Sequence, residues 1–316
     1  MERAANAIPD FWNRAMTTEL TTEFTTVHPT PMLVGECPLW HAAERSIYWV
    51  DIGGYTVHRK HPLTGEHREW LMPSEPSALA IHPHGGLLVA TRNGIMHLDT
   101  ASAEASMVTP APYDTAVIRF NDGRVDPAGR FWIGTMYEPR DQELAAMYCL
   151  EKGKLSLKWQ GGMTVSNGLA FSPDQPMMYH ADTTSHRIDR YHFDVETGAV
   201  AHPQRFQQFS TDKAASSYGG RPDGAAVDSE GAYWCAMIEG ARLLRFSPEG
   251  DLLREVKLPV RCPSMMAFGG DDLKTLYITT ISHGRSREER EQYPLTGCVL
   301  AMQVDVAGRE EPMYLP

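Results

Sequence analysis

The sequence predicts an all-β fold, a six-bladed β-propeller with four-stranded antiparallel blades. A turn rich in Pro, Gly or Asp that runs directly into a short aromatic or β-branched strand occurs six times along the 316 residues. Equivalent residues of these copies lie 40 to 55 residues apart, which is enough for four short strands and their turns. Amphipathic helical patterns of ten or more residues are absent from the interior of the sequence, which argues against α/β barrels and doubly wound sheets.

Each copy is recognised by the strand that follows its opening turn. The six segments are AAERSIYWVD, HPHGGLLVAT, DPAGRFWIGT, SPDQPMMYHAD, DSEGAYWCAM and GDDLKTLYITT. Their central strand residues, used here as markers, are Tyr48, Leu88, Trp132, Tyr179, Trp234 and Tyr277. A second strand such as YTVHRKHP follows, and Gly-containing segments such as HPLTGEH are typical of hairpin turns. We expect the aromatic markers to pack between the blades.

The two ends of the chain differ from the repeat. We expect residues 1–27 to form an extension whose strand-like stretch, Leu20 to Val27, closes the ring by completing the last blade, and residues 28–316 to form the propeller. Met16 within this extension is either an alternative start or part of a frayed terminus. The charged stretch 282–297 is expected to be a solvated loop before the final strand.

Composition and charge exclude several classes of partner. The formal net charge is −11, so the molecule as a whole repels nucleic-acid backbones and anionic membrane surfaces. No stretch approaches the roughly 18 consecutive apolar residues of a membrane span, and the N-terminus lacks the apolar core of a secretory signal. The five cysteines show no CxxC spacing, which favours reduced, buried thiols. We therefore expect a cytoplasmic protein that is a monomer or a weak homo-oligomer.

Four of the six copies carry a carboxylate or carboxamide side chain 11 or 12 residues before the marker. These residues are Glu36, Asn121, Asn167 and Asp223. In a propeller this offset falls where the chain enters the innermost strand, so the four side chains should converge at one end of the central channel. The other two copies have Ser77 at this offset and Ser264 or Met265 near it, so the polar set does not continue around the ring.

A buried cluster with two carboxylates predicts a cation, because burying uncompensated charge is unfavourable. Carboxylate and amide oxygens suit Ca²⁺, Mg²⁺ or Mn²⁺ and accept other divalent ions. The tripeptides Asn-Asp-Gly and Pro-Asp-Gly are ordinarily turns, but four such sites at one common offset favour a functional cluster. On symmetry alone the propeller should hold a central metal ion with all four residues as direct ligands.

The blade segments also resemble those of a known family. GECPLW, RFNDGRVDPAGRFWIGTM, SNGLAFSPD, RPDGAAVDSEG and FGGDDLKTLYITT occur in the order of the successive blade signatures of the SMP-30/gluconolactonase/regucalcin-like sugar lactonases. The resemblance covers nearly the whole chain from about Val34 onward. It implies one catalytic divalent metal ion, of the type Ca²⁺, Mn²⁺, Mg²⁺, Zn²⁺ or Fe(II), and hydrolysis of a small-molecule sugar (aldono-) lactone to the free sugar acid.

The resemblance also implies roles for individual residues. The implied metal ligands are Glu36, Asn167 and Asp223. Asp223 would also act as general base toward the attacking water. Arg119 and Asn121 would contact the sugar hydroxyls, which moves Asn121 one step away from the metal. Glu138, which follows the GTM strand, is a further candidate for substrate binding.

Other interpretations remain open. Related propellers include metal-dependent arylesterases and phosphotriesterases, and a non-enzymatic calcium-binding or protein-binding propeller would bind metal without turnover. Thirteen histidines suggest zinc, but none forms HExxH or another compact ligand pattern, so we expect them on the surface or in turns, as for His82 and His84. Asp51 and Asp182 end equivalent strands, where they should bind backbone amides.

Overall fold

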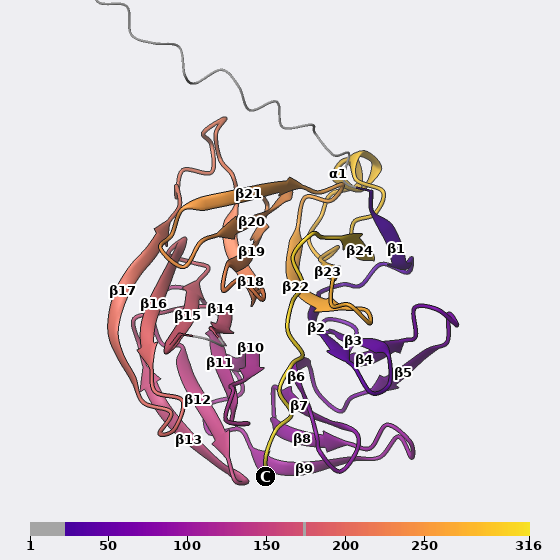
Figure 1. Ribbon diagram of the computed structural model, residues 1–316, viewed down its shortest axis with the longest axis vertical. Helices are drawn as coiled ribbons and strands as arrows, with labels where there is room; N and C mark the ends of the chain where they lie inside the picture. The colour runs from indigo at the N-terminus through magenta and orange to yellow at the C-terminus, as the bar shows by residue number, and fades with distance from the viewer. Residues whose placement is uncertain (1–22, 173–174) are drawn as a thin grey trace, which may run out of the picture.

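A computed structural model describes residues 23–172 and 175–316. The described chain forms six four-stranded antiparallel sheets arranged as blades around a central axis, as Figure 1 shows. The predicted six-bladed propeller is therefore confirmed. Each marker residue lies on the second strand of its blade, and the polar residues of the predicted cluster lie on the first, innermost strand.

Within each of blades 1 to 5 the strands follow one another in chain order from the axis outward. Blade 1 consists of β2 (Gly35–His41), β3 (Ser46–Asp51), β4 (Thr56–Lys60) and β5 (His67–Leu71). Blade 2 consists of β6 (Pro76–Ile81), β7 (Leu87–Thr91), β8 (Gly94–Leu98) and β9 (Ala105–Pro110). Blade 3 consists of β10 (Ile118–Val125), β11 (Phe131–Tyr137), β12 (Ala146–Glu151) and β13 (Lys154–Gln160).

The later blades repeat this plan. Blade 4 consists of β14 (Ser166–Phe171), β15 (Met177–Asp182), β16 (Arg187–Phe193) and β17 (Val200–Gln208). Blade 5 consists of β18 (Arg221–Val227), β19 (Tyr233–Ile238), β20 (Arg242–Phe246) and β21 (Leu252–Lys257). Blade 6 consists of β22 (Pro263–Gly269), β23 (Thr275–Thr280), β24 (Val299–Gln303) and, as its outer strand, β1 (Thr25–His28).

Blade 6 is completed by the N-terminal part of the chain. Strand β1 pairs antiparallel with β24 through Thr25 opposite Ala301 and Thr26 opposite Leu300, and its register shifts before His28. Only part of the expected closing stretch, Leu20 to Val27, lies within the described residues, and Met16 lies outside them. The pairing joins the two ends of the propeller in one sheet, so this blade has no unpaired outer edge at β24.

The stretch 282–297 is not simply a loop, as the sequence had suggested. It contains α1 (Arg287–Gln292), which begins after Ser286, whose side chain accepts a hydrogen bond from the backbone N–H of Glu289. Acidic residues in the first turn interact favourably with the helix N-terminus. All six residues of the helix are exposed to some degree, so helix capping rather than a hydrophobic face accounts for its formation.

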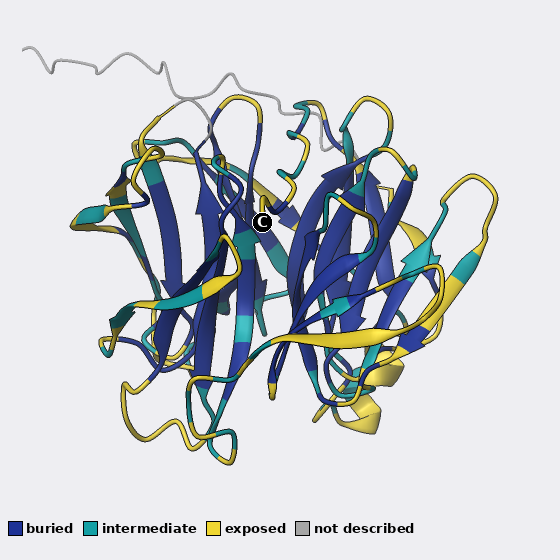
Figure 2. Ribbon diagram, turned by 90° about the horizontal axis from the view of Figure 1, so that it is seen from below, coloured by how far each residue is buried: buried dark blue, intermediate teal, exposed yellow. Residues whose placement is uncertain are grey.

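The core lies between the blades and is rich in aromatic side chains, as Figure 2 shows by the buried inner strands and exposed outer loops. The markers Trp132 and Trp234 are almost fully buried, and each donates its indole N–H to an aspartate of its own blade, Asp126 or Asp228, at 2.8 Å. The predicted packing role of the aromatic markers is confirmed. All five cysteines are buried and unpaired, as predicted.

The two strand-ending aspartates have the structural role expected of them. Asp51 accepts hydrogen bonds from the backbone N–H groups of Leu33 and Val34, at 2.9 and 2.8 Å. Asp182 does the same for the residues that enter β14, at 3.1 and 3.0 Å. Each carboxylate therefore anchors the segment that leads into an innermost strand.

Within residues 23–172 and 175–316, no helix has the length and apolar character that a membrane span requires.

Candidate metal centre

Every innermost strand carries a β-bulge near its beginning. The register against the second strand shifts between Glu36 and Leu39 in β2, between Asn167 and Ala170 in β14, and at equivalent places in β6, β10, β18 and β22. A bulge leaves residues without a ladder partner and redirects their side chains. The bulges thus turn the polar residues toward the axis at one end of the channel.

A glycine at one bulge shows how closely the inner strands approach. Gly168, next to Asn167, has a φ of +60°, and a Cβ atom there would lie 2.5 Å from the Tyr233 hydroxyl. That hydroxyl donates a hydrogen bond to the carbonyl of Gly168 at 2.9 Å. Only glycine can adopt this backbone angle and leave enough space for the Tyr233 hydroxyl. Steric constraints therefore explain why glycine follows Asn167 in the SNG segment.

Three of the four predicted cluster residues are joined by hydrogen bonds across three blades. The amide nitrogen of Asn121 donates to Oδ1 of Asn167 at 2.8 Å, and the amide nitrogen of Asn167 donates to Oδ1 of Asp223 at 2.6 Å. Asn121 also donates to the backbone carbonyl of Ser166 at 2.8 Å. Asn167 and Asp223 are each only 4% exposed, so this row of polar groups lies inside the molecule.

Glu36 of β2 belongs to the same group electrostatically. Loss of hydration, followed by the negative charges of Asp223 and Asp122, raises the pKa of Glu36 well above its ordinary value. Burial likewise raises the pKa of Asp223 to about 8, although Arg221 opposes the shift. The negative charge of Asp223 therefore disfavours the charged form of Glu36.

Two residues that sequence reasoning missed support this row. Thr183 accepts a hydrogen bond from the Asn167 amide at 2.8 Å and donates to the carbonyl of Pro222 at 2.7 Å, which orients the carboxamide. Asp122, buried beside Asn121, accepts from the backbone N–H of Leu169 at 2.9 Å. The Asn-Asp-Gly segment could have pointed to Asp122, whereas no local pattern singles out Thr183.

Asp122 adds a third acidic group near the axis. Burial raises its pKa, and its second carboxylate oxygen has no hydrogen-bond partner among the described residues. Its charge also raises the pKa of both Glu36 and Asp223. The inner end of the site is therefore strongly acidic, which favours binding of a cation.

Arg119 and Glu138 lie beside the row rather than in it. The guanidinium of Arg119 donates from Nη1 to Oδ1 of Asn121 at 2.8 Å, and its Nε lies 3.7 Å from Glu138. Glu138 in turn forms a two-pronged ion pair with Arg92, at 2.9 and 2.8 Å, and Arg92 also binds Glu75 at 2.9 Å. Both Glu138 oxygens are thus engaged by Arg92, and Arg119 fixes the carboxamide of Asn121.

At the other end of the inner strands the C-terminal segment, drawn in yellow in Figure 1, contacts blades 2 and 3. Tyr314 donates from its backbone to Ile81 of blade 2, and Leu315 donates to Gly129 of blade 3, at 2.9 and 2.8 Å. Arg124, at the far end of β10, forms an ion pair with Glu311 of this segment. The cluster lies near the start of the inner strands, at the end opposite to this segment.

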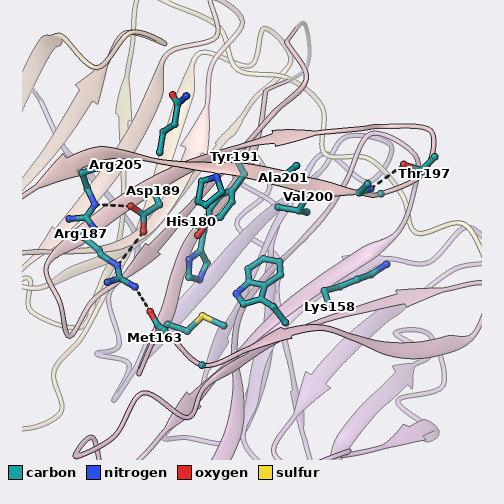
Figure 3. A pocket seen from close by; sticks show the side chains of 17 residues that line it. Lys158, Met163, His180, Arg187, Asp189, Tyr191, Thr197, Val200, Ala201 and Arg205 are labelled. Atoms are coloured by element: carbon teal, nitrogen blue, oxygen red, sulfur yellow. Dashed lines mark hydrogen bonds and ion pairs between the residues drawn. The ribbon is translucent and has the colours of Figure 1, made fainter.

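A larger cavity on the flank is separate from this cluster. It has a volume of about 850 Å³, lies between the outer strands of blades 3 and 4, and is lined by none of the predicted site residues (Figure 3). Trp159, Tyr191 and the buried His180 line it, and Arg187 and Arg205 both pair with Asp189 at its rim, at 3.2 and 2.7 Å. The predicted site residues therefore do not line this 850 Å³ cavity, and its volume gives no information about the axial cluster.

The axial residues fit a divalent cation by their chemistry. Glu36 and Asp223 supply two carboxylates, and the charge of Asp223 raises the pKa of Glu36. Oδ1 of Asn167 accepts one hydrogen bond, from Asn121, and a carbonyl oxygen has a second lone pair available. A set of hard oxygen donors with excess negative charge is the kind of site in which Ca²⁺, Mg²⁺ or Mn²⁺ binds.

Comparisons with known proteins identify the relatives of this chain. The chain is 43% identical over 284 residues, 90% of its length and 96% of the relative's, to the 6-deoxy-6-sulfogluconolactonase of Pseudomonas putida. It is 32% identical over 293 residues to pentonolactonase XacC of Haloferax volcanii, covering 91% of this chain and 96% of that one.

A solved structure described as a calcium-binding protein, regucalcin, from Agrobacterium tumefaciens superposes with a TM-score of 0.87 at 27% identity, covering 93% of this chain and 98% of the other. The family model described as the SMP-30/Gluconolactonase/LRE-like region matches residues 34–282. This match covers all six innermost strands, on which the acidic cluster is built. The chain belongs to the SMP-30/gluconolactonase/LRE-like family.

Proposed function

We propose that this protein is a metal-dependent sugar lactonase that opens an aldonolactone to the free sugar acid. The observation that carries the proposal is the buried row of Asn121, Asn167 and Asp223 with Glu36 beside it, in a chain whose relatives are named as lactonases. In this proposal Glu36, Asn167 and Asp223 hold one divalent cation. When bound, such an ion supplies Lewis acidity toward a carbonyl oxygen and lowers the pKa of a water ligand.

Asp223 serves as the general base in this proposal. Its Oδ1 accepts a hydrogen bond from Asn167, which leaves Oδ2 to take a proton from the water that attacks the lactone carbonyl. Burial raises the pKa of Asp223 in the metal-free protein, and the positive charge of a bound cation would oppose this shift, so that the carboxylate would be ionised and able to accept the proton. The same proton can then pass to the ring oxygen as the ester bond breaks, so the products are a carboxylic acid and a free hydroxyl.

Arg119 and Asn121 bind the sugar in this proposal. Nη1 of Arg119 donates to Asn121 and to the carbonyl of Phe120 at 2.9 Å, and Nη2 donates to the sulfur of Met136 at 3.3 Å. The second N–H group of Nη2 and the N–H group of Nε, which lies 3.7 Å from Glu138, are the donors that meet sugar hydroxyl groups in this proposal. The planar guanidinium fixes the directions of these donors. Because Glu138 is occupied by Arg92, its contribution to substrate binding is to hold the positive charges at the mouth in place.

The substrate class is tested by a panel of lactones. Chelator-treated protein is resupplied in turn with Ca²⁺, Mg²⁺, Mn²⁺, Zn²⁺ and Fe²⁺, and acid release from pentono-, hexono- and 6-sulfo-hexonolactones is followed with a pH indicator. Turnover that depends on the added ion supports the proposal. Turnover of aryl esters or organophosphates but of no lactone would replace it with the esterase alternative, and saturable metal binding without any turnover would replace it with a binding protein.

A matched pair of variants assigns the activity to the cluster. Glu36→Gln removes one axial carboxylate, and we expect loss of both metal binding and turnover. Asp141→Asn removes an exposed carboxylate of blade 3 outside the row and should leave both unchanged. Equal turnover in the two variants would show that the reaction takes place elsewhere.

We also propose that the protein works in the cytoplasm as a monomer or weak homo-oligomer, without nucleic acid or membrane as a partner. Five buried, unpaired cysteines suit a reducing compartment. The net charge of −11 disfavours polyanionic partners. Sedimentation of the purified protein across a concentration series would reveal a stable oligomer, and cell fractionation would reveal a different compartment.

A further inference from the structure

A second group of metal-ligating side chains lies on the outer strands of blade 1, away from the axial cluster. His58 of β4 stands opposite Glu69 of β5, and His67 lies two residues before Glu69 on the same face of β5. The pairing of these two strands brings the three side chains together, although nine or more residues separate His58 from the others. The expectation that histidines lie on the surface or in turns holds for His84 but is wrong for His58, which is 3% exposed.

The separations of the candidate ligand atoms match those of a zinc site. Nδ1 of His58 lies 3.2 Å from Nε2 of His67 and 3.8 Å from a carboxylate oxygen of Glu69, and all three atoms lie within 4.8 Å of one another. Tetrahedral zinc binds nitrogen and oxygen at about 2.0–2.1 Å, which places its ligand atoms roughly 3.3 Å apart. Small side-chain rotations therefore suffice to close this group around one ion.

The surroundings orient the two imidazoles for this purpose. Nε2 of His58 is hydrogen-bonded to the Thr56 hydroxyl at 2.7 Å, which leaves Nδ1 facing His67. The rings of His58 and His67 are only 13° from parallel, with centroids 5.4 Å apart, and Nδ1 of His58 and Nε2 of His67 lie at hydrogen-bonding distance, with one proton between them as the tautomers allow. A metal ion would take the place of that proton, and the partner on the far side of the ring is typical of metal-binding histidines.

Charge and access also suit a cation. Burial lowers the pKa of His58 to about 3 and also lowers the pKa of His67, so both rings are neutral and offer lone pairs at neutral pH. The side chain of Glu69 is 63% exposed, which gives an ion a path from solvent. Lys60 is the nearby charge that opposes binding, and Glu69 offsets it.

The group lies against the strand that closes the ring. The ring of His28, the last residue of β1, lies 4.6 Å from that of His67 and 5.8 Å from that of His58. It also lies 5.3 Å from the ring of Trp49 in the core of blade 1. Strand β1 has only four residues and an irregular register, so anything that rigidifies these rings stabilises its attachment to blade 1.

We propose that His58, His67 and Glu69 form a second metal site that binds a zinc-type divalent ion and braces the closing strand against blade 1. The site is independent of the proposed lactonase function, because it shares no residue with the axial cluster. Its preference is for a borderline ion with imidazole ligands, whereas the axial oxygen donors prefer harder ions.

Zinc titration of the full-length, chelator-treated protein tests this proposal. The background variant Glu36→Gln/Asp223→Asn removes the axial carboxylates, and calorimetry should still detect one equivalent of Zn²⁺. Adding His58→Ala should abolish that equivalent, and adding Glu69→Gln, at an exposed position that does not threaten folding, should weaken it at least tenfold. His84→Ala, in an exposed turn, is the matched control and should change nothing.

Two further readouts do not depend on the axial site. Zinc at a hundredfold excess over its Kd should raise the Tm of the background variant by about 5 °C or more, and His67→Gln should remove the rise. Co²⁺ should give the intense visible absorption of a four-coordinate ion in the background variant and not in His67→Gln. Absence of a saturable zinc equivalent in the background variant, or zinc binding that survives both His58→Ala and Glu69→Gln, would overturn the proposal.

Discussion

Asp223→Asn should make the metal-free protein more stable at alkaline pH while it removes activity. In the folded protein the pKa of Asp223 is raised from 3.8 to about 8, chiefly by burial. Between these values the folded state binds more protons than the unfolded state, so stability is fully present below about pH 4 and is lost as the pH rises toward 8. The difference corresponds to roughly 5 kcal/mol at pH 8 and above.

The asparagine variant has no charge to lose and can keep the hydrogen bond from Asn167, because its Oδ1 can occupy the same position. Measured by urea unfolding in EDTA, the variant should equal the wild type near pH 4 and exceed it by several kcal/mol, at most about 5, at pH 8. Calcium should then stabilise the wild type and not the variant, because the ion compensates the charge that the variant lacks.

The control for this experiment is Asp141→Asn, whose carboxylate is exposed. Its unfolding free energy should follow the wild type at every pH. A variant at Asp223 that is less stable than the wild type at pH 8 in EDTA would refute the reasoning, because it would mean that the buried carboxylate stabilises the metal-free fold. Equal stabilisation of both proteins by calcium would remove Asp223 from the metal site.

Three further outcomes test the site. Arg119→Ala should raise KM for the lactone roughly 10- to 100-fold in steady-state kinetics, because charge-assisted hydrogen bonds to the sugar are lost. An unchanged KM would exclude Arg119 from substrate binding. Thr183→Val, which keeps the shape but removes the acceptor for the Asn167 amide, should weaken metal binding about tenfold by calorimetry, with full affinity arguing against a positioning role. Gly168→Ala should destabilise the fold by roughly 2–4 kcal/mol in denaturant, since its φ is positive and the new Cβ meets the Tyr233 hydroxyl, and a neutral effect would contradict the tight packing of the bulge.

The repeat pattern allowed the architecture to be predicted because each blade satisfies its own backbone hydrogen bonds with neighbours in the sequence. The spacing from Tyr48 to Tyr277 and the buried aromatic strands are local signals, and they were sufficient for the number of blades. The polar offset of Glu36, Asn167 and Asp223 was readable for the same reason, since equivalent positions in a closed ring must converge. By contrast, the short helix α1 depends on the cap at Ser286. The many charged residues around this serine had favoured the prediction of a loop.

Side-chain contacts between paired strands or between blades could not be predicted from the sequence. The hydrogen bond between Thr183 and Asn167 depends on the pairing of β14 with β15 within blade 4. The grouping of His58, His67 and Glu69 depends on the register of β4 and β5 within blade 1. The ion pairs that bind Glu138 to Arg92 join residues 46 positions apart. Such contacts produce no repeating pattern in the sequence, because each of them occurs only once in the propeller.

The sequence by itself therefore determined the propeller, its six blades and the chemical character of the axial cluster, all of which follow from repeated local patterns. Only the tertiary structure decided the hydrogen-bonded order of Asn121, Asn167 and Asp223, the contact of the C-terminal segment with blades 2 and 3, and the histidine group beside the closing strand. The physical reason is that the packing of the whole ring sets two quantities, the direction of a side chain at a β-bulge and the distance between side chains of neighbouring blades. No single strand determines either of them.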